Sequence, residues 1–310
     1  MKRVLITGGA GYIGSRLARK LARRCEVTVL DNLRRGRAES LAQAWNDVRF
    51  VAGDVRDAGT LDRVTSGVEV IFHLAAESAV MTADADPEYC FETNVTGTFR
   101  VLQAARTNGV RRLVFSSSRE VYGDPERVPV AESAALNPKN AYGCSKASAE
   151  MLCGAFASGG VEVAIVRLSN VYGPGDKGRV IPRFVENALL DAPFVLYGGE
   201  QVIDFVWVET VVRALERLGL GPYVAGPLNV ASGQGTSITE LCRRVREAAG
   251  SKSRVEMAAR REVEVCRFVA DVSAAKSAIG LEVPEDPLFG LEEVVESARG
   301  QLVLEGAYAV

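Results

Sequence analysis

The sequence is poor in the residues that metal centres, disulfide scaffolds and membrane spans require. It has a single histidine, His73, and six cysteines that are scattered along the chain without a CxxC pair. A transition-metal site and a disulfide framework are therefore not expected, and the cysteines favour a cytoplasmic chain with reduced thiols. The apolar runs are short, and the 37 lysines and arginines, balanced by 39 acids, form no basic stripe. We expect neither a membrane nor a nucleic-acid partner.

A glycine-rich segment joins the first apolar run to the first helical pattern. Residues 3–7 are typical of a strand, residues 15–21 have helical periodicity, and Gly8-Gly9-Ala10-Gly11-Tyr12-Ile13-Gly14 lies between them. Glycines in this context allow a tight turn, a close approach to a pyrophosphate and close packing of helix on strand. Free amides at the helix N-terminus then face the phosphates. The segment predicts a dinucleotide site.

The second strand, residues 26–30, ends in Asp31, which is followed by Asn32. An acid at this position accepts hydrogen bonds from the ribose hydroxyls and repels a 2′-phosphate, which favours NAD over NADP. Arg34 and Arg35 lie close by, and an arginine there could instead meet a 2′-phosphate.

Strand and helix patterns alternate along the first half of the chain. Further strands are predicted at residues 48–52, 68–74, 112–116 and 161–168, and helices at 87–107 and 142–157. Such alternation predicts an α/β fold with a Rossmann-type doubly wound parallel sheet. After Pro174, glycine, proline and charge increase. We expect an NAD-binding domain over residues 1–175 and a smaller α/β substrate-binding region over 176–310, with segments near 203–230 returning to the main sheet.

Three polar side chains predict a hydride-transfer site. Ser118 follows a strand, and Tyr142 and Lys146 are four residues apart on one helical face. A phenol has a reference pKa near ~10, so it needs a nearby ammonium and the positive nicotinamide to favour the phenolate. The phenol would move the proton while the nicotinamide takes the hydride, and Ser118 would hydrogen-bond to the same substrate oxygen.

With these motifs, nearly the whole chain resembles the extended short-chain dehydrogenase/reductase family, specifically its nucleotide-sugar epimerases and dehydratases, of which UDP-glucose 4-epimerase is an example. The matching segments are residues 7–14, 31–33, 53–55, 73–76, 116–123, 142–146, 167–175 and 229–233.

The resemblance implies a role for each matching position. Asp54 and Val55 would hold the adenine, Lys146 would reach the nicotinamide ribose, and Asn170 and Arg261 would bind the substrate diphosphate. The implied catalytic residues are Ser118, Tyr142, Lys146 and Glu120. The implied cofactor residues are Gly8, Gly11, Tyr12, Ile13, Gly14, Asp31, Asn32, Asp54, Val55, Leu74, Ala75, Ala76, Asn94, Ser116, Tyr142 and Lys146. The implied substrate residues are Glu77, Ser118, Arg119, Asn170, Arg179 and Arg261. No metal is expected, and we interpret His73 as structural.

Glu120 bears on the choice between epimerisation and elimination. In the resembling enzymes a 4-hydroxyl is oxidised to a ketone, which acidifies the hydrogen at C5. Dehydratases and uronate decarboxylases carry a glutamate two positions after the serine, as here, and residues 74–78 also look like the dehydratases. However, Arg119 stands where 4,6-dehydratases place an aspartic acid, and an arginine cannot serve as that acid. Arg119 could pair with a substrate carboxylate or with Glu120, and Glu120 could also be a solvated loop acid.

A second departure concerns Ile203, which precedes Asp204 and Phe205 where relatives carry an arginine. An isoleucine at this position cannot make the arginine's charged hydrogen bond, which is worth about 1.5–3 kcal/mol, and Arg179 or Arg183 could compensate for it.

The sequence therefore predicts an NAD-dependent nucleotide-sugar 4-epimerase acting on a UDP-hexose or UDP-hexuronate through a 4-keto intermediate. The alternatives are a 4,6-dehydratase or related eliminating or decarboxylating enzyme with Glu120 as the C5 base, and a non-catalytic NAD-sensing protein. The hydride returns to the product, so NAD is expected to stay bound. The resemblance also implies a homodimer, formed through helices near residues 91–107 and 142–157.

Overall fold

A seven-stranded parallel sheet forms the centre of the larger part of the molecule in the computed structural model, which describes residues 1–304 and 306. Its strand order is β10-β6-β5-β4-β1-β2-β3. The strands are β1 (Lys2–Thr7), β2 (Cys25–Asp31), β3 (Val48–Ala52), β4 (Val70–His73), β5 (Arg112–Ser118), β6 (Glu162–Leu168) and β10 (Gly226–Val230). All paired strands in it run parallel.

Helices cover both faces of this sheet because alternate strand residues point to opposite sides. Val4 and Ile6 belong to one apolar cluster and Leu5 to the other. The first face is covered by α1 (Tyr12–Ala22), α8 (Val208–Leu220) and α10 (Ser273–Ile279), and the second by α2 (Ala58–Thr65), α5 (Gly97–Thr107) and α6 (Ala141–Ala157). Short helical segments connect them: η1 (Ala38–Ala44), α3 (Val80–Ala85), α4 (Pro87–Phe91), η2 (Glu92–Thr96) and η3 (Arg119–Tyr122).

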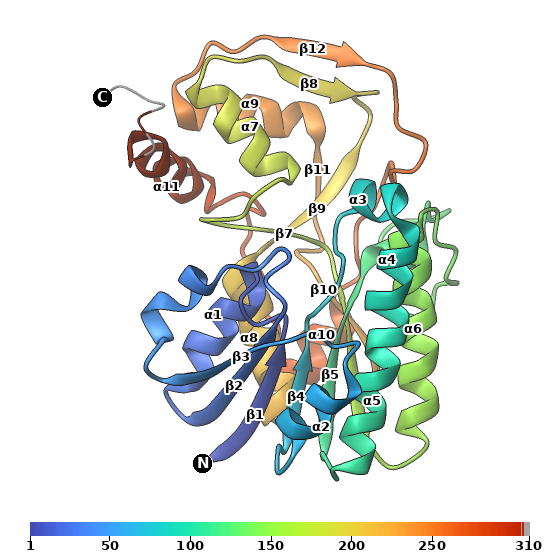
Figure 1. Cartoon of the computed structure of the whole chain (residues 1–310). Helices are drawn as coiled ribbons and strands as arrows, with labels where there is room; N and C mark the ends of the chain where they lie inside the picture. The colour runs from blue at the N-terminus through green and yellow to red at the C-terminus, as the bar shows by residue number, and fades with distance from the viewer. Residues whose placement is uncertain (305, 307–310) are drawn as a thin grey trace.

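A smaller unit lies beyond the carboxyl ends of the main strands (Figure 1). It contains a three-stranded sheet of β7 (Asn170–Tyr172), β9 (Val202–Trp207) and β11 (Gly235–Ser237), and a two-stranded sheet of β8 (Phe194–Tyr197) and β12 (Val255–Ala258). Its helices are α7 (Val180–Leu189), α9 (Ile238–Ala249) and α11 (Leu291–Leu304), and its apolar cluster is separate from those of the main sheet.

The predicted fold class is confirmed, and the predicted strands of the first half differ from the observed ones by one or two residues at their ends. The expected single helix over residues 87–107 is α4 and α5 joined by a π-helical turn at Glu92–Thr96.

The expectation that segments near 203–230 return to the main sheet is right for β10 and wrong for β9. β10 joins the main sheet beside β6, but β9 pairs with β7 and β11 in the smaller sheet. The physical reason is the buried carboxylate of Asp204 on β9. It accepts hydrogen bonds from the backbone amides of Ser232, Gly233 and Ala270 at 2.8–3.1 Å, which hold β9 at the junction of the two units.

A buried ionic network fixes the long helix α6 to the main sheet. Arg167 on β6 donates to both carboxylate oxygens of Glu150 on α6, at 2.7 Å for the shortest bond, and to the hydroxyl of Tyr122 at 2.8 Å. The carboxylate of Glu150 also accepts from Ser117 on β5. Because each charge is paired and hydrogen-bonded, these contacts offset the cost of removing the charges from water. The network also sets the position of α6, the helix that carries Tyr142 and Lys146.

Candidate active site

The turn after β1 has the geometry that a dinucleotide requires. Gly8 has a φ of +69°, and a Cβ there would lie 2.7 Å from the amide nitrogen of Ala75. A Cβ on Gly14 would overlap the carbonyl oxygen of Gly8. Helix α1 begins after Gly11, which has no side chain to cap it. Within the described chain the amides of Tyr12, Ile13 and Gly14 therefore have no partner and are available to phosphate oxygens.

Asp31 lies at the end of β2, where a ribose is expected. Its carboxylate accepts from the backbone amides of Ala10 at 3.0 Å and Leu33 at 2.8 Å, and burial raises its pKa. These bonds hold the 31–37 loop against the glycine turn. Asn32 donates to Asp54 at 2.9 Å. Hydrogen bonds from Arg56 lower the pKa of Asp54 to about 2, and Val55 beside it is buried.

The two arginines that could have met a 2′-phosphate both have acidic partners. The guanidinium of Arg34 lies 3.5 Å above the ring of Tyr89 and 3.6 Å from Asp86. Arg35 Nη1 lies 2.8 Å from Glu77 Oε1. With Asp31 beside them, this arrangement favours NAD over NADP.

The loop after β4 contains Leu74, Ala75 and Ala76, and its position is set by Asn94. The Asn94 amide accepts from the Glu77 amide at 2.8 Å and donates to the Glu77 carbonyl at 2.9 Å and to Ser145 Oγ at 2.8 Å. The Glu77 carboxylate accepts from the amides of Ser78 and Ala79. The side chains of Asn94 and Glu77, which were expected to contact the cofactor and the substrate, thus hydrogen-bond to other residues of the chain.

His73 is a structural residue, as interpreted. It is buried, and burial lowers its pKa to about 3, so the ring is neutral. The hydroxyl of Thr98 donates to the Asn94 carbonyl at 2.6 Å, so it accepts from His73 Nε2 at 2.9 Å. Nδ1 then accepts from the hydroxyl of Thr7 at 2.7 Å. The histidine joins β4 to β1 and to α5.

Tyr142 and Lys146 lie on α6 beneath the carboxyl end of β5. Burial raises the pKa of Tyr142 to about 12, whereas Ser118 and Arg179 act to lower it. Lys146 Nζ donates to the carbonyl of Ser116 at 2.7 Å, and burial lowers its pKa to about 8. Ser118, at the end of β5, accepts from the Glu120 amide at 3.2 Å. The structure thus places Ser118 beside Tyr142, with Lys146 one helical turn further along α6.

Glu120 is a buried acid with two side-chain partners, and not a solvated loop residue. Its Oε1 lies 2.8 Å from Arg119 Nη2, and its Oε2 accepts from Asn140 Nδ2 at 2.9 Å. Arg119 Nε donates in turn to Asn170 Oδ1 at 2.7 Å. Sequence reasoning missed Asn140, whose only signal was an asparagine at a helix N-cap position.

Three of the residues expected to bind the substrate lie in the smaller unit. Asn170 begins β7, and Arg179 is the N-cap residue of α7, 3.2 Å from Asp176. Arg261 lies 3.5 Å above the ring of Tyr197 and 2.9 Å from Glu264. Ile203 supplies no charge and packs against the apolar cluster of this unit. Arg183 is exposed, whereas the charge of Arg179 acts to lower the pKa of Tyr142.

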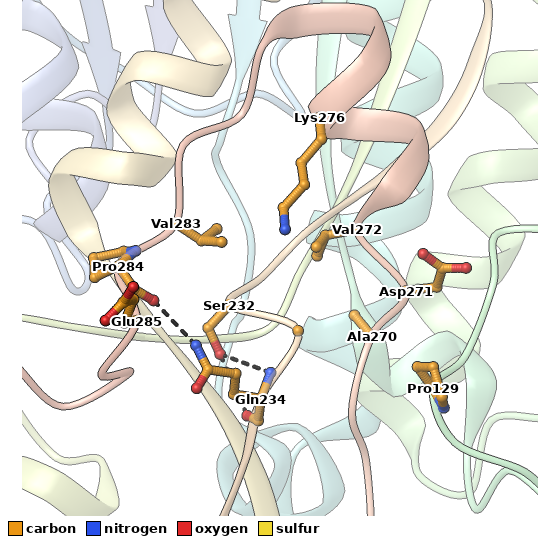
Figure 2. Close-up of a pocket in the computed structure, with 11 residues that line it drawn as sticks. Pro129, Ser232, Gln234, Ala270, Asp271, Val272, Lys276, Val283, Pro284 and Glu285 are labelled. Carbon is orange, nitrogen blue, oxygen red and sulfur yellow. Dashed lines mark hydrogen bonds between the residues drawn. The ribbon is translucent and has the colours of Figure 1, made fainter.

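A separate pocket of about 370 Å³ lies beside the β10–β11 connection (Figure 2). Its lining includes Ser232, Gln234, Lys276 and Glu285, and none of the predicted site residues. Gln234 donates across it to the Pro284 carbonyl at 3.0 Å. In the described part of the chain, no three potential ligands gather around a metal position, and no helix is long and apolar enough to cross a membrane.

The parallel sheet, the glycine turn and the Ser118, Tyr142 and Lys146 triad define an NAD-dependent enzyme of the short-chain dehydrogenase/reductase class. The chain belongs to the NAD dependent epimerase/dehydratase family, whose model matches residues 4–220.

Three relatives show the range of chemistry in this family. The chain is 35% identical to a UDP-glucose 4-epimerase of Mycolicibacterium smegmatis over 96% of its length and 99% of the relative. It is also 35% identical to UDP-glucuronic acid decarboxylase 4 of Arabidopsis thaliana, over 96% of this chain and 68% of the relative. The crystal structure of a dTDP-glucose 4,6-dehydratase from Streptomyces venezuelae with NAD bound superposes with a TM-score of 0.92 at 34% identity, covering 97% of this chain and 98% of the other.

Proposed function

We propose that the protein is a nucleotide-sugar 4-epimerase that acts on a UDP-hexose or UDP-hexuronate through a 4-keto intermediate. The observation that carries this proposal is the environment of Glu120. Both of its oxygens are held by the chain's own donors, and the adjacent position is occupied by Arg119. An arginine cannot protonate a departing hydroxyl, so the site is equipped for oxidation and reduction at C4 but not for elimination at C6.

The residues of the triad have distinct tasks in this reaction. When bound, the nicotinamide would take up the hydride from C4 of the sugar and return it to the same carbon. The phenolate of Tyr142 would accept the proton of the 4-hydroxyl, and the phenol so formed would later give it back, while Ser118 would hydrogen-bond to the same oxygen. Lys146, whose ammonium donates to the Ser116 carbonyl, would place positive charge beside the cofactor ribose. The glycine turn and Asp31 hold the pyrophosphate and the adenosine ribose.

A dehydratase or decarboxylase is the second candidate function. The observation that favours it is the burial of Glu120 two residues after Ser118, where it lies close enough to influence Tyr142. For Glu120 to act as the C5 base, its carboxylate would have to be released from Arg119 or Asn140 when the sugar binds.

The products formed in heavy water distinguish these functions. Purified protein is incubated in D₂O with UDP-glucose, UDP-galactose and UDP-glucuronate, and the sugars are followed by NMR. We expect inversion at C4 without deuterium at C5. Deuterium at C5 with loss of the C6 hydroxyl would identify a dehydratase, and loss of carbon dioxide a decarboxylase. No change in any of the three sugars would contradict the proposal. Full activity of Glu120→Gln would argue against both eliminating functions.

The same assay addresses a non-catalytic NAD sensor. We expect Tyr142→Phe to bind NAD as the unaltered protein does and to lose turnover by about 100-fold or more, because the phenol is the proton carrier. If the unaltered protein and Tyr142→Phe behave alike, the protein is not an epimerase of this type.

We also propose that NAD remains bound through turnover, that the protein is cytoplasmic and that it is a homodimer. Bound NAD would be seen as absorbance released into the supernatant on denaturation. The six cysteines are all free, which supports a reducing compartment. Exposed apolar side chains support a dimer formed through α4, α5 and α6: Phe91 is 54% exposed, Phe99 37% and Met151 69%.

A further inference from the structure

We propose that Asn140 is a positioning residue that holds the carboxylate of Glu120, and through it Arg119, in register with Tyr142. This inference rests on the proposed function, since it assigns a role within the same site. Asn140 is buried and lies two residues before Tyr142, as the N-cap of α6. A cap residue is ordinarily a local device for the helix alone, whereas this one also contacts the acid.

The orientation of the Asn140 amide follows from its partners. Its Oδ1 accepts from the backbone amide of Gly143 at 2.8 Å, which caps the helix. The nitrogen therefore faces the other way, where it donates to Glu120 Oε2 at 2.9 Å and to the Val263 carbonyl at 3.1 Å. Every polar group of the side chain is used, and one of its bonds reaches the segment next to Arg261.

The chain of contacts continues from Glu120 across the site. Glu120 Oε1 binds Arg119 at 2.8 Å, and Arg119 Nε donates to Asn170 at 2.7 Å. Four side chains thus connect the start of α6, the turn after β5 and the start of β7. A Cβ on Gly143 would lie 2.6 Å from the carbonyl oxygen of Glu120, so the first turn of α6 also rests against the Glu120 backbone.

Capping alone does not require an asparagine. Serine and aspartate cap helices about equally well. Neither can replace the donor to Glu120, however, since a serine hydroxyl is too short to reach both groups and an aspartate has only acceptors when ionised. These two residues therefore separate the capping role of Asn140 from its role toward Glu120.

The charged and titratable groups on the elements around Glu120 are few. On its own turn there is Arg119, on α6 there is Tyr142, and Arg179 also acts on Tyr142. On α3, which packs against α6, the carboxylate of Asp84 accepts from the Ala141 amide at 2.9 Å. The segments before α6 and around Val263 contribute the ion pairs Lys139–Asp124 and Arg261–Glu264. Among these groups Glu120 is the one that the Asn140 side chain itself contacts, at 2.9 Å, so a new carboxylate at position 140 would act on it most directly.

The test compares Asn140→Asp with Asn140→Ser. Because both keep a cap, we expect melting temperatures within a few degrees of the unaltered protein. In Asn140→Asp a second carboxylate opposes ionisation of Glu120, so the acidic limb of the pH profile of kcat/KM moves up by about 1 pH unit. In Asn140→Ser we expect kcat/KM to fall about tenfold without that shift. Combined with Glu120→Gln, neither change at position 140 should have a further effect.

Wild-type kcat/KM and an unchanged pH profile in both variants would overturn the inference and leave Asn140 as a cap. If the unaltered protein turns over none of the nucleotide sugars, the proposed function fails first, and the inference is tested without turnover. The Glu120 carboxyl carbon is then titrated by ¹³C NMR, assigned by its absence in Glu120→Gln. Its titration should move to higher pH in Asn140→Asp, and an unmoved titration would overturn the inference.

Discussion

Lys146 is buried against the Ser116 carbonyl and the ring of Phe115, and burial lowers its pKa to about 8. In the unfolded chain the ammonium regains its ordinary pKa of 10.5. Below pH 8 both states are protonated, and the folded state bears the full cost of the buried charge. As pH rises from 8 to 10.5 the folded state loses its proton first, so this residue's contribution to stability increases with pH.

We therefore expect Lys146→Met to stabilise the NAD-free protein at pH 7 while abolishing turnover. The gain should be about 2 kcal/mol, less than the full cost of the shift because the bond to Ser116 is lost, and should shrink towards pH 10.5. Denaturant unfolding at pH 7 and pH 10 measures it. Lys139→Met, whose lysine lies in a surface pair with Asp124, is the control and should show no such gain. A Lys146→Met protein that is less stable at pH 7, or equally changed at both pH values, would refute the expectation.

At the scale of elements, the strand order brings the loops after β2 and β4 together. These strands flank β1, so a contact between their loops passes over the glycine turn that follows β1. Arg35 on the first loop and Glu77 on the second make that contact at 2.8 Å. Asn94 holds the backbone of Glu77 and also binds Ser145 on α6, so the bridge is connected to the catalytic helix.

We expect Glu77→Gln to release NAD about fivefold faster than the unaltered protein, because the charged bond across the turn is lost while the acceptor for Ser78 and Ala79 remains. Stopped-flow measurement of NAD release tests this, and Arg35→Met should have the same effect. Asp86→Asn removes the neighbouring ion pair with Arg34 and keeps the α4 cap, so it serves as the control. If Arg35→Met released NAD faster and Glu77→Gln did not, the ion pair between Arg35 and Glu77 would have no role in holding NAD.

At the scale of the whole molecule, the residues expected at the site come from both units. The cofactor turn and the triad belong to the main sheet, whereas Asn170, Arg179 and Arg261 come from the smaller unit. Asp204 holds the two together at the point where β9 crosses. On another side of the main sheet, α4, α5 and α6 lie next to one another (Figure 1) and carry the exposed apolar side chains proposed as a dimer contact.

We expect Met151→Glu on α6 to convert the proposed dimer to a monomer of 33.2 kDa in solution, because the new charge would be buried between copies. Light scattering after size exclusion measures the mass. Met257→Glu introduces the same change on β12, at a methionine that is 64% exposed, and should leave the mass unaltered. A monomeric unaltered protein, or a dimeric Met151→Glu variant, would contradict the expectation.

The first half of the chain could be predicted closely because its signals are local. The strand, the glycine turn and the helix of the cofactor motif follow one another directly in the sequence, so they can be recognised together. Tyr142 and Lys146 lie on one face of α6 because helical residues four apart share a face. Asp31 likewise follows its strand directly. The structural role of His73 could also be predicted, since a residue at the end of an apolar strand is expected to be buried.

What depended on tertiary structure were contacts between residues far apart in the chain. Arg35 and Glu77, Glu120 and Asn140, and Arg119 and Asn170 are separated by 20 to 51 residues, and no local pattern brings them together. The same holds for β9, whose sequence suits any buried strand and whose sheet partners, β7 and β11, come from other parts of the chain. The sequence by itself determined the cofactor turn and the spacing of Tyr142 and Lys146. Only the tertiary structure decided how Glu120 is held, because Asn140, which donates to its Oε2, lies 20 residues further along the chain at the start of α6.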